Sequence, residues 1–188
     1  MRKISDDLKE IFEVVDKTGK VIGQAKREEC HRDRSLIHKA IHLYIFNKDG
    51  KVFLQKRSQT KDVSPGCWTA SASGHLMVVE DFEKAIKREA KEELGVVLKD
   101  KDLKWIGSFL IKGPQETELI GLYLAYHEGP FKTEINEIEK LDWFELEALF
   151  NKAKENKVKL TFNAHHFLTN KKIKKAMRDY VVKFKKKR

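Results

Sequence analysis

Three glutamates, Glu89, Glu92 and Glu93, lie close together in a stretch whose spacing predicts a helix over residues 80 to 94. The apolar residues of this stretch recur with the helical period and form one stripe: Phe82, Ala85, Ile86, Ala90 and Leu94. Glu89 and Glu93 project within the stripe, and Glu92 lies at its edge. Carboxylates that face a protein core are costly unless they are paired or bind a metal. The pattern therefore predicts a site for Mg²⁺ or Mn²⁺ that holds a diphosphate through its metal.

The alternative interpretation of a helix rich in Glu and Lys is a solvated face with salt bridges between residues four apart. That interpretation fits this helix poorly, because its lysines lie on the side opposite Glu89 and Glu93. Arg88 lies at the edge of the stripe beside Glu92. It is either the partner of one glutamate or a surface residue.

The composition is that of a globular protein and argues against membrane and disulfide-rich classes. The chain has 188 residues, of which 40% are hydrophobic and 36% charged, and no apolar run approaches the length of a membrane span. The charged N-terminus lacks the apolar stretch of a signal peptide, so the expected compartment is the cytoplasm. Cys30 and Cys67 form no CxxC pair and are expected to be reduced. The net charge is +10, with much of the excess in the last stretch, which fits either nucleic acid or a phosphorylated small molecule as the partner.

The elements that must position these residues alternate irregularly between strands and helices, which predicts an α/β fold with a mixed sheet and helices packed on it. An N-terminal hairpin is expected over about residues 11–27, and KDG joins residues 38–47 to 51–57 in a second hairpin. Residues 60–75 are predicted to be a polar loop, and residues 103–111 and 118–127 to be strands. A later helix is expected to begin near Asp142 or Glu145, and a basic C-terminal helix covers about residues 165–188. All of residues 1–188 are expected to form a single domain.

Residues 74 to 96 resemble the Nudix box, G-x5-E-x7-R-E-U-x-E-E-x-G-U, in which U is apolar. Every fixed position has its match: Gly74, Glu80, Arg88, Glu89, Glu92, Glu93 and Gly95. The resemblance implies a loop–helix–loop motif in an α/β/α sandwich with a mixed sheet, the Nudix fold. It also implies that the box glutamates hold divalent cations and that the enzyme cleaves nucleoside diphosphates linked to another group. Gly74 is expected to allow the tight loop before the helix, and Gly95 to end the helix.

A longer stretch, residues 30 to 75, is similar to the isopentenyl diphosphate isomerase branch of the same superfamily. In that branch three histidines and two acids bind a metal, and the matching residues here are His31, His38, His75, Glu116 and Glu118. If residues 116–118 form a strand, both acids point to one face. Three imidazoles and two carboxylates suit Mn²⁺ or Zn²⁺ rather than Mg²⁺ alone, so the resemblance implies a second metal site. The remaining histidines are interpreted as ordinary polar surface residues: His42, His127, His165 and His166.

Two basic residues, Arg57 and Lys61, match the pair that grips the diphosphate in the isomerase. An arginine can hold two phosphate oxygens at once, and a lysine acts as a point charge. The resemblance therefore implies that Arg57 and Lys61 bind the substrate.

The sequence departs from the isomerase at the residue before the glycine that opens the box. The isomerase needs a cysteine there, whereas this chain has Ser73. A thiol with a pKa of about 8.5 can take part in moving a proton from one carbon to another, and a serine hydroxyl is far weaker. Cys67 lies six residues earlier, in the wrong place on the loop. The aromatic segment near the end of the isomerase also has no match, since TFNAHHF lacks the Trp.

The leading hypothesis is a metal-dependent Nudix hydrolase that cleaves a phosphoanhydride bond in a nucleoside diphosphate or a related diphosphate. Glu93 or Glu118 is the expected general base. One alternative is an isopentenyl diphosphate isomerase with altered acid–base chemistry, which Ser73 disfavours. Another is a non-catalytic binder of nucleotides or RNA, but no RRM, KH or zinc-finger pattern is present. A small-molecule diphosphate is therefore the expected partner, ahead of nucleic acid and without a membrane, and the sequence leaves the substrate and the oligomeric state open.

Overall fold

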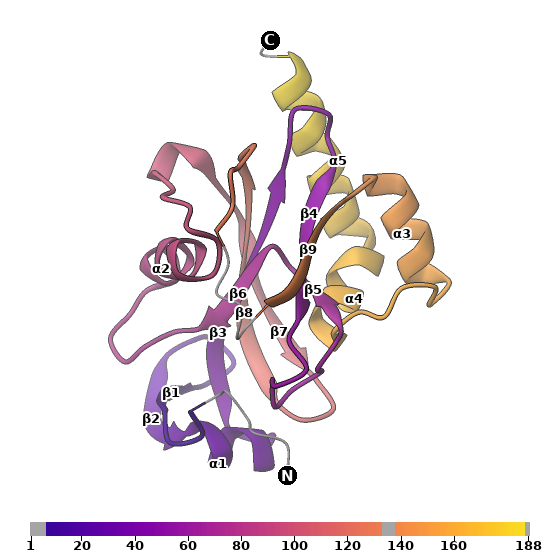
Figure 1. The fold of residues 1–188 in the computed structure, drawn as a ribbon. Coiled ribbons are helices and arrows are strands. Elements are labelled where there is room, and N and C mark those ends of the chain that lie inside the picture. The colour runs from indigo at the N-terminus through magenta and orange to yellow at the C-terminus, as the bar shows by residue number, and fades with distance from the viewer. Residues whose placement is uncertain (1–6, 133–137, 187–188) are drawn as a thin grey trace.

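Strand β3 (Ile37–Phe46) lies at the centre of the sheet, because it pairs with β1, β4, β6 and β8. The structure, a computed structural model, describes residues 7–132 and 138–186. The β3–β8 pairing is parallel and the other three are antiparallel, so the sheet is mixed. Helix α2 covers one face of the sheet, and α3, α4 and α5 cover the other (Figure 1). The predicted α/β/α sandwich with a mixed sheet is confirmed.

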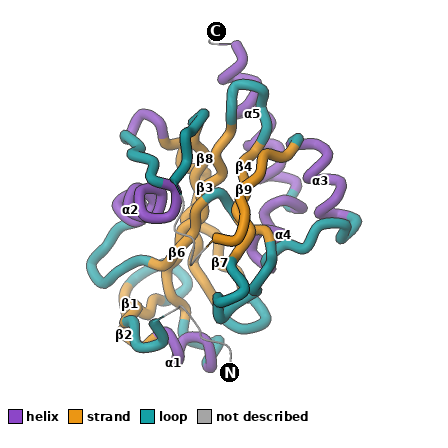
Figure 2. The backbone as a smooth tube through the Cα atoms, in the orientation of Figure 1, coloured by secondary structure: helices purple, strands orange, loops and turns teal. Residues whose placement is uncertain are grey.

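The order of helices and strands along the chain can be followed in Figures 1 and 2. Besides β3, the strands are β1 (Ile11–Val15), β2 (Val21–Lys26), β4 (Val52–Arg57), β5 (Trp68–Thr69), β6 (Ala72–His75), β7 (Leu103–Lys112), β8 (Thr117–Tyr126) and β9 (Ile138–Phe144). The helices are α1 (Arg27–Arg32), α2 (Phe82–Leu94), a 3₁₀ turn η1 (Asp100–Asp102), α3 (Leu146–Lys154), α4 (Phe162–Thr169) and α5 (Lys171–Lys186).

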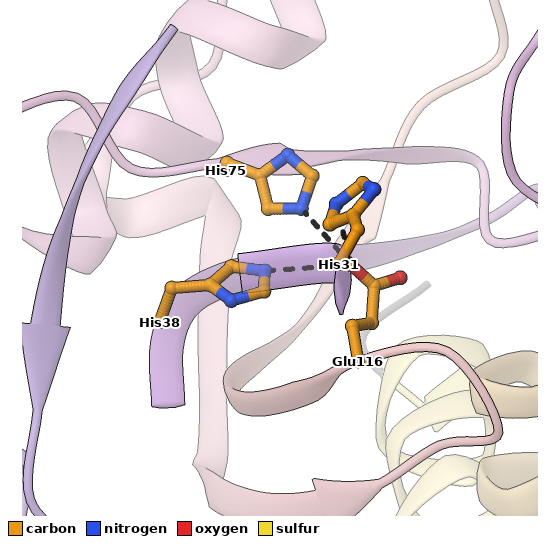
Figure 3. A group of neighbouring side chains, drawn as sticks. All are labelled: His31, His38, His75 and Glu116. Atoms are coloured by element: carbon orange, nitrogen blue, oxygen red, sulfur yellow. Dashed lines mark ion pairs between the residues drawn. The ribbon is translucent and has the colours of Figure 1, made fainter. Parts of the chain in front are cut away.

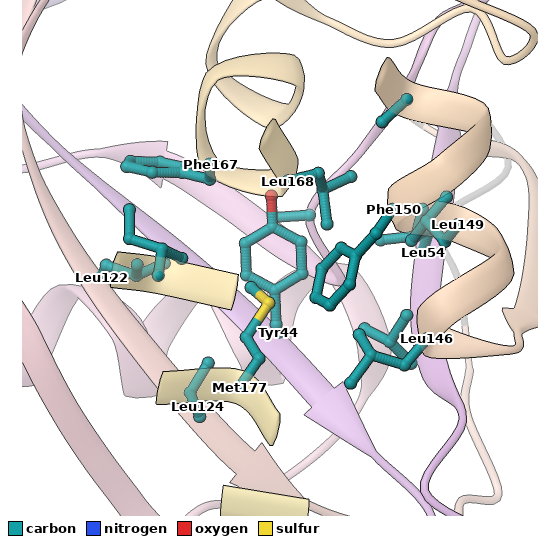
Figure 4. Packing of buried hydrophobic residues seen from close by; sticks show 14 of the residues in the cluster. Tyr44, Leu54, Leu122, Leu124, Leu146, Leu149, Phe150, Phe167, Leu168 and Met177 are labelled. Carbon is teal, nitrogen blue, oxygen red and sulfur yellow. The ribbon is translucent and has the colours of Figure 1, made fainter. Parts of the chain in front are cut away.

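Apolar side chains are buried on both faces of the sheet, because successive residues of a strand point to opposite sides. Toward α2, Ile41 and Leu43 of β3 belong to a cluster that includes Ile86 and Leu94 of that helix. Toward α3, α4 and α5, Tyr44 of β3 lies among aliphatic and aromatic side chains of all three helices (Figure 4). Strand β3 is therefore an almost continuous buried run, as strands covered on both faces usually are.

Helix α2 begins and ends at residues suited to those positions. The side chain of Asp81, its N-cap, accepts a hydrogen bond from the Lys84 N–H over 2.8 Å. Gly95 follows the helix with a φ of 66°, in the left-handed region that favours glycine, so the predicted role of Gly95 in ending the helix is confirmed. The apolar stripe of α2 faces the sheet and is largely buried, and Glu93 is buried with it.

The region predicted to be a polar loop, residues 60–75, contains the two short strands β5 and β6. Their hydrogen bonds are made to β4 and β3, which lie earlier in the chain. A prediction from local composition therefore missed both strands.

The C-terminal part confirms one prediction and differs from another. Of the two predicted starts of the first helix there, Glu145 is confirmed, because it is the N-cap of α3, whereas Asp142 lies in strand β9. In place of one helix from about residue 165, α4 and α5 meet at Asn170, whose side chain accepts a hydrogen bond from the Lys172 N–H over 3.0 Å. None of the helices in the described part of the chain is both long enough and apolar enough to span a bilayer.

The sheet splits beside β3. Among the described residues, β3 and β4 pair only next to their connecting turn, at Ile45–Phe53 and Phe46–Val52. Farther along, β6 lies against β3 while β5 and β9 lie against β4. The two halves of the sheet therefore diverge, and side chains from both faces can reach the space between them.

Candidate functional site

A cavity of about 530 Å³ lies where the two halves of the sheet diverge. Strands β3 and β6 line one side of it, the end of β4 and strand β5 line the other, and α2 and the start of α4 complete the wall. It brings together eight residues that the sequence predicts for the site: Arg57, Lys61, His75, Glu89, Glu92, Glu93, Glu116 and Glu118. The cavity therefore joins the acids of α2 to Glu116 and Glu118, at the start of β8, and to both predicted phosphate-binding residues.

The three glutamates of α2 differ in their surroundings. Glu93 is 9% exposed, and its Oε2 accepts hydrogen bonds from Gln55 Nε2 over 2.9 Å and from the Ser73 N–H over 3.0 Å. Glu89 is half-buried, and Glu92 is exposed. The predicted inward orientation thus describes Glu93 best, and Glu92 faces the mouth of the cavity.

Arg88 is a partner of several acids at once, which decides between the two interpretations of this residue. Its guanidinium forms a fork with Glu80, at 2.9 and 3.0 Å, and donates to Glu89 over 2.6 Å and to Glu92 over 3.1 Å. It also donates to the backbone oxygen of His75 over 2.9 Å. One arginine therefore links α2 to the loop before it and to the end of β6 and holds the α2 acids in place.

Gly74 has a role other than the predicted tight loop. It lies in strand β6, opposite Ile41 of β3. A Cβ atom added there would lie 2.0 Å from Glu89 Oε1, far inside any real contact. A side chain at this position would have to displace the carboxylate of Glu89, which occupies that space.

A second group of side chains, His31, His38, His75 and Glu116, converges (Figure 3), and two of them, His75 and Glu116, line the cavity. Their potential ligand atoms all lie within 4.8 Å of one another. Glu116 Oε2 is 2.9 Å from His31 Nε2, 3.5 Å from His38 Nε2 and 4.0 Å from His75 Nε2. The four residues come from α1, β3, β6 and the segment just before β8, so only the folded chain brings them together.

The surroundings of this group fit a metal ion. Among the described residues, no hydrogen-bond partner with good geometry meets His31 Nε2, either ring nitrogen of His38, or Glu116 Oε2, although all are buried. Buried polar atoms normally have partners, and an ion would provide one for several of them at once. His31 Nδ1 lies 3.4 Å from Asp62, the kind of carboxylate that orients a metal-binding imidazole.

Two features set the conditions for binding a metal here. Burial alone would lower the pKa of His31, but the carboxylates of Asp62 and Glu116 outweigh it and raise that pKa to about 9. An ion must therefore displace the proton of His31. Arg27 Nη1 lies 3.4 Å from His75 Nδ1, and because a guanidinium only donates, the proton of that ring lies on Nε2 until a metal replaces it or the ring turns over.

Glu118 lies beside this group rather than within it. It is 5% exposed, its Oε1 lies 3.6 Å from His75 Nε2, and its Oε2 accepts a hydrogen bond from Asn163 of α4. Burial, and then the charge of Glu116, raise the pKa of Glu118 to about 7. Its carboxyl group can therefore exchange a proton near neutral pH.

Sequence reasoning missed several residues of the cavity wall. His42, interpreted from sequence as a surface residue, is 5% exposed and lines the cavity, so that interpretation is wrong. Its spacing of four residues from His38 along one strand was the available signal, because both side chains must share a face. Thr69, Thr161 and Asn163 also line the cavity, and nothing in their local sequence indicated it.

Comparison with known proteins gives a consistent result. Residues 36–165 match the family model described as NUDIX domain. The chain is 34% identical over 152 residues to Isopentenyl-diphosphate Delta-isomerase 2 of Photorhabdus laumondii, covering 77% of this chain and 84% of that protein. It is 30% identical over 134 residues to the uncharacterized Nudix hydrolase YfcD of Escherichia coli K12, covering 71% and 73%. The crystal structure of DR0079 from Deinococcus radiodurans has the same fold, with a TM-score of 0.71 at 21% identity over 85% of this chain and 97% of that one.

Removing one histidine tests whether the His/Glu group binds an ion. At a Zn²⁺ concentration a hundredfold above the dissociation constant, we expect the melting temperature of the unchanged protein to rise by about 5–10 °C. His38→Ala removes one ligand and should lose most of that rise in scanning calorimetry. His165→Ala, outside the group, should keep it. An equal rise in His38→Ala would show that the four residues do not bind the ion.

Gly74→Ala tests whether Glu89 is a metal ligand, because the added methyl group must displace its carboxylate. In a His38→Ala background, which isolates the α2 acids, we expect Gly74→Ala to weaken Mn²⁺ binding by about tenfold or more in an EPR titration. Gly23→Ala is the matched control, since its Cβ would meet nothing within 4 Å. Unchanged Mn²⁺ affinity in Gly74→Ala would remove Glu89 from the ligand set.

Proposed function

Because the chain belongs to the Nudix family, in its isopentenyl diphosphate isomerase-like branch, we propose that it is a metal-dependent hydrolase that cleaves a phosphoanhydride bond in a nucleoside diphosphate or a related diphosphate. The observation that carries the proposal is the cavity that contains the acids of α2, Glu116 and Glu118, and the two basic residues. Carboxylates are the ligands that Mg²⁺ and Mn²⁺ use when they hold substrate phosphates. Arginine and lysine bind the phosphate oxygens directly.

Each group of residues has a part in this reaction. Glu89, Glu92 and Glu93 would hold Mg²⁺ or Mn²⁺, which when bound neutralises phosphate charge and lowers the pKa of water. Arg57 and Lys61 orient the diphosphate, and Arg57 is itself held by a hydrogen bond to the backbone oxygen of Val63 over 2.9 Å. His31, His38, His75 and Glu116 would hold Mn²⁺ or Zn²⁺, with Glu118 at the edge of that site.

Two acids can accept the proton of the attacking water. Glu93 lies at the sheet side of α2, where hydrogen bonds to one of its oxygens hold the carboxylate in place. Glu118 has a pKa of about 7, close to the value that suits a general base at neutral pH. We assign the role to Glu93 first, because it belongs to the α2 acids, and to Glu118 second.

Glu93→Gln tests this assignment. Glutamine keeps the size of the side chain and an oxygen acceptor for the Ser73 N–H, so circular dichroism and melting temperature should change little. We expect kcat for metal-dependent hydrolysis to fall by about 10²–10⁴-fold, the usual effect of losing a general base. The substrates are a panel of nucleoside diphosphates, nucleotide sugars and dinucleotides, assayed with Mg²⁺ and with Mn²⁺.

Glu83→Gln, on the exposed side of the same helix, is the matched control and should keep full activity. Full activity in Glu93→Gln would move the role of general base to Glu118 or elsewhere.

The second candidate is an isopentenyl diphosphate isomerase, which the His/Glu group and the relative from Photorhabdus favour. Ser73 stands where the isomerase needs its cysteine, and Cys67 is buried and is not among the described residues that line the cavity. A serine hydroxyl is a poor proton donor and acceptor beside a thiol. This function is therefore ranked below hydrolysis.

Direct assay separates the two functions. Incubated with isopentenyl diphosphate and Mg²⁺ or Mn²⁺, the protein is expected to form no dimethylallyl isomer that NMR can detect, because Ser73 supplies no thiol. The isomerase named above serves as the positive control. Isomer formation at an ordinary enzymatic rate would reverse the ranking.

A further inference from the structure

One wall of the cavity carries no metal ligand, phosphate-binding residue or general base of the proposed hydrolysis. It consists of uncharged polar side chains, here called the polar wall: His42, Thr69, Ser73, Thr161 and Asn163. Ser73 lies directly opposite His42 in the pairing of β6 with β3. Thr161 donates to Thr69 through their hydroxyl groups over 3.2 Å. Facing residues of paired strands stand close together, so His42 and Ser73 present one continuous polar surface to the cavity.

His42 is the one imidazole in this wall, and the proposed hydrolysis gives it no role. It is 5% exposed, and its ring meets the edge of Phe167 from α4 with centroids 5.4 Å apart. Among the residues that the structure describes, no group hydrogen-bonds to its Nδ1. Because Nδ1 is buried, the ring nitrogen that a ligand in the cavity can reach is Nε2, which is not among the buried unpaired atoms of the described residues.

The protonation of His42 decides what it offers to a ligand. Burial, and then the charge of Arg57, lower the pKa of His42 to about 3, so its imidazole is neutral at physiological pH. A neutral imidazole carries one N–H and one bare nitrogen. Nδ1 is buried and meets neither a donor nor an acceptor among the described residues. A buried N–H without an acceptor is rarer in proteins than a buried acceptor without a donor, so we place the proton on Nε2. The ring is therefore a hydrogen-bond donor through Nε2, and the ligand atom that it suits is an oxygen.

We propose that His42 is a specificity-determining residue whose Nε2–H donates to an oxygen of the group that the diphosphate carries. This inference rests on the proposed function, because it places the diphosphate on Arg57, Lys61 and the α2 acids. The carried group is polar and rich in hydroxyl or carbonyl oxygens, as a sugar is. A hydrocarbon chain would leave the Nε2–H of His42 unpaired, and sites built to hydrogen-bond reject ligands that lack the partner.

The test compares binding of three compounds that share a bridging methylene group and resist hydrolysis. They are α,β-methylene-ADP, isopentenyl methylenebisphosphonate and methylenebisphosphonate alone, titrated calorimetrically with Mg²⁺ present. For the unchanged protein we expect α,β-methylene-ADP to bind at least tenfold more tightly than the isopentenyl compound. His42→Leu should weaken the binding of α,β-methylene-ADP at least tenfold and leave the affinity for methylenebisphosphonate unchanged. His42→Gln, which places an N–H donor near the position of Nε2, should restore most of the loss.

The outcomes separate this inference from the proposed function. Binding of methylenebisphosphonate alone tests the diphosphate site, and its absence would overturn both. If it binds but the isopentenyl compound binds as tightly as α,β-methylene-ADP, the specificity assigned to His42 is wrong and the diphosphate site stands. If His42→Leu weakens the binding of all three compounds equally, the residue supports the fold of the cavity and does not select the ligand.

Discussion

The site depends on a constraint of the sheet, namely that β3 and β4 stay together for only two residue pairs and then separate. In a closed sheet, the acids of α2 would be walled off from the side chains on the opposite face. Here β5 and β6 each add to one of the separated strands and keep their backbone groups paired. The opening therefore leaves no long stretch of unpaired strand backbone beside it in the described part of the chain. It lets Glu93 from one layer share a cavity with Glu118 and His42 from the other.

Gathering so many acids in one cavity requires compensation, and the chain provides it in two ways. Around α2, Arg88 donates to three glutamates, and amide groups of Gln55 and Ser73 hold Glu93. Around Glu116, burial alone would raise its pKa, but the neighbouring imidazoles of His31, His38 and His75 hold it well below its ordinary value. The first arrangement keeps the acids charged and positioned, and the second keeps a carboxylate ionised inside the protein.

Much of the site could be predicted wherever the signal was local. The period of α2, the glycine that ends it and its inward glutamates depend on residues within a few turns of one another. The matched pattern of histidines and acids also indicated residues that the fold does bring together. What could not be predicted depends on strand register and on contacts between distant segments. The burial of His42 depends on α4, the contact of Asn163 with Glu118 spans 45 residues, and the space beside Gly74 is filled by a side chain from another element.

The position of α1 in the chain has a consequence of its own. His31, together with Arg27 beside it, lies N-terminal to the segment 36–165 that matches the family model, whereas every acid of α2 lies inside that segment. The His/Glu group therefore combines one residue from outside the matched segment with three from within it, His38, His75 and Glu116. A chain reduced to residues 36–165 would keep every glutamate of α2 but lose one of the four residues that converge in the His/Glu group.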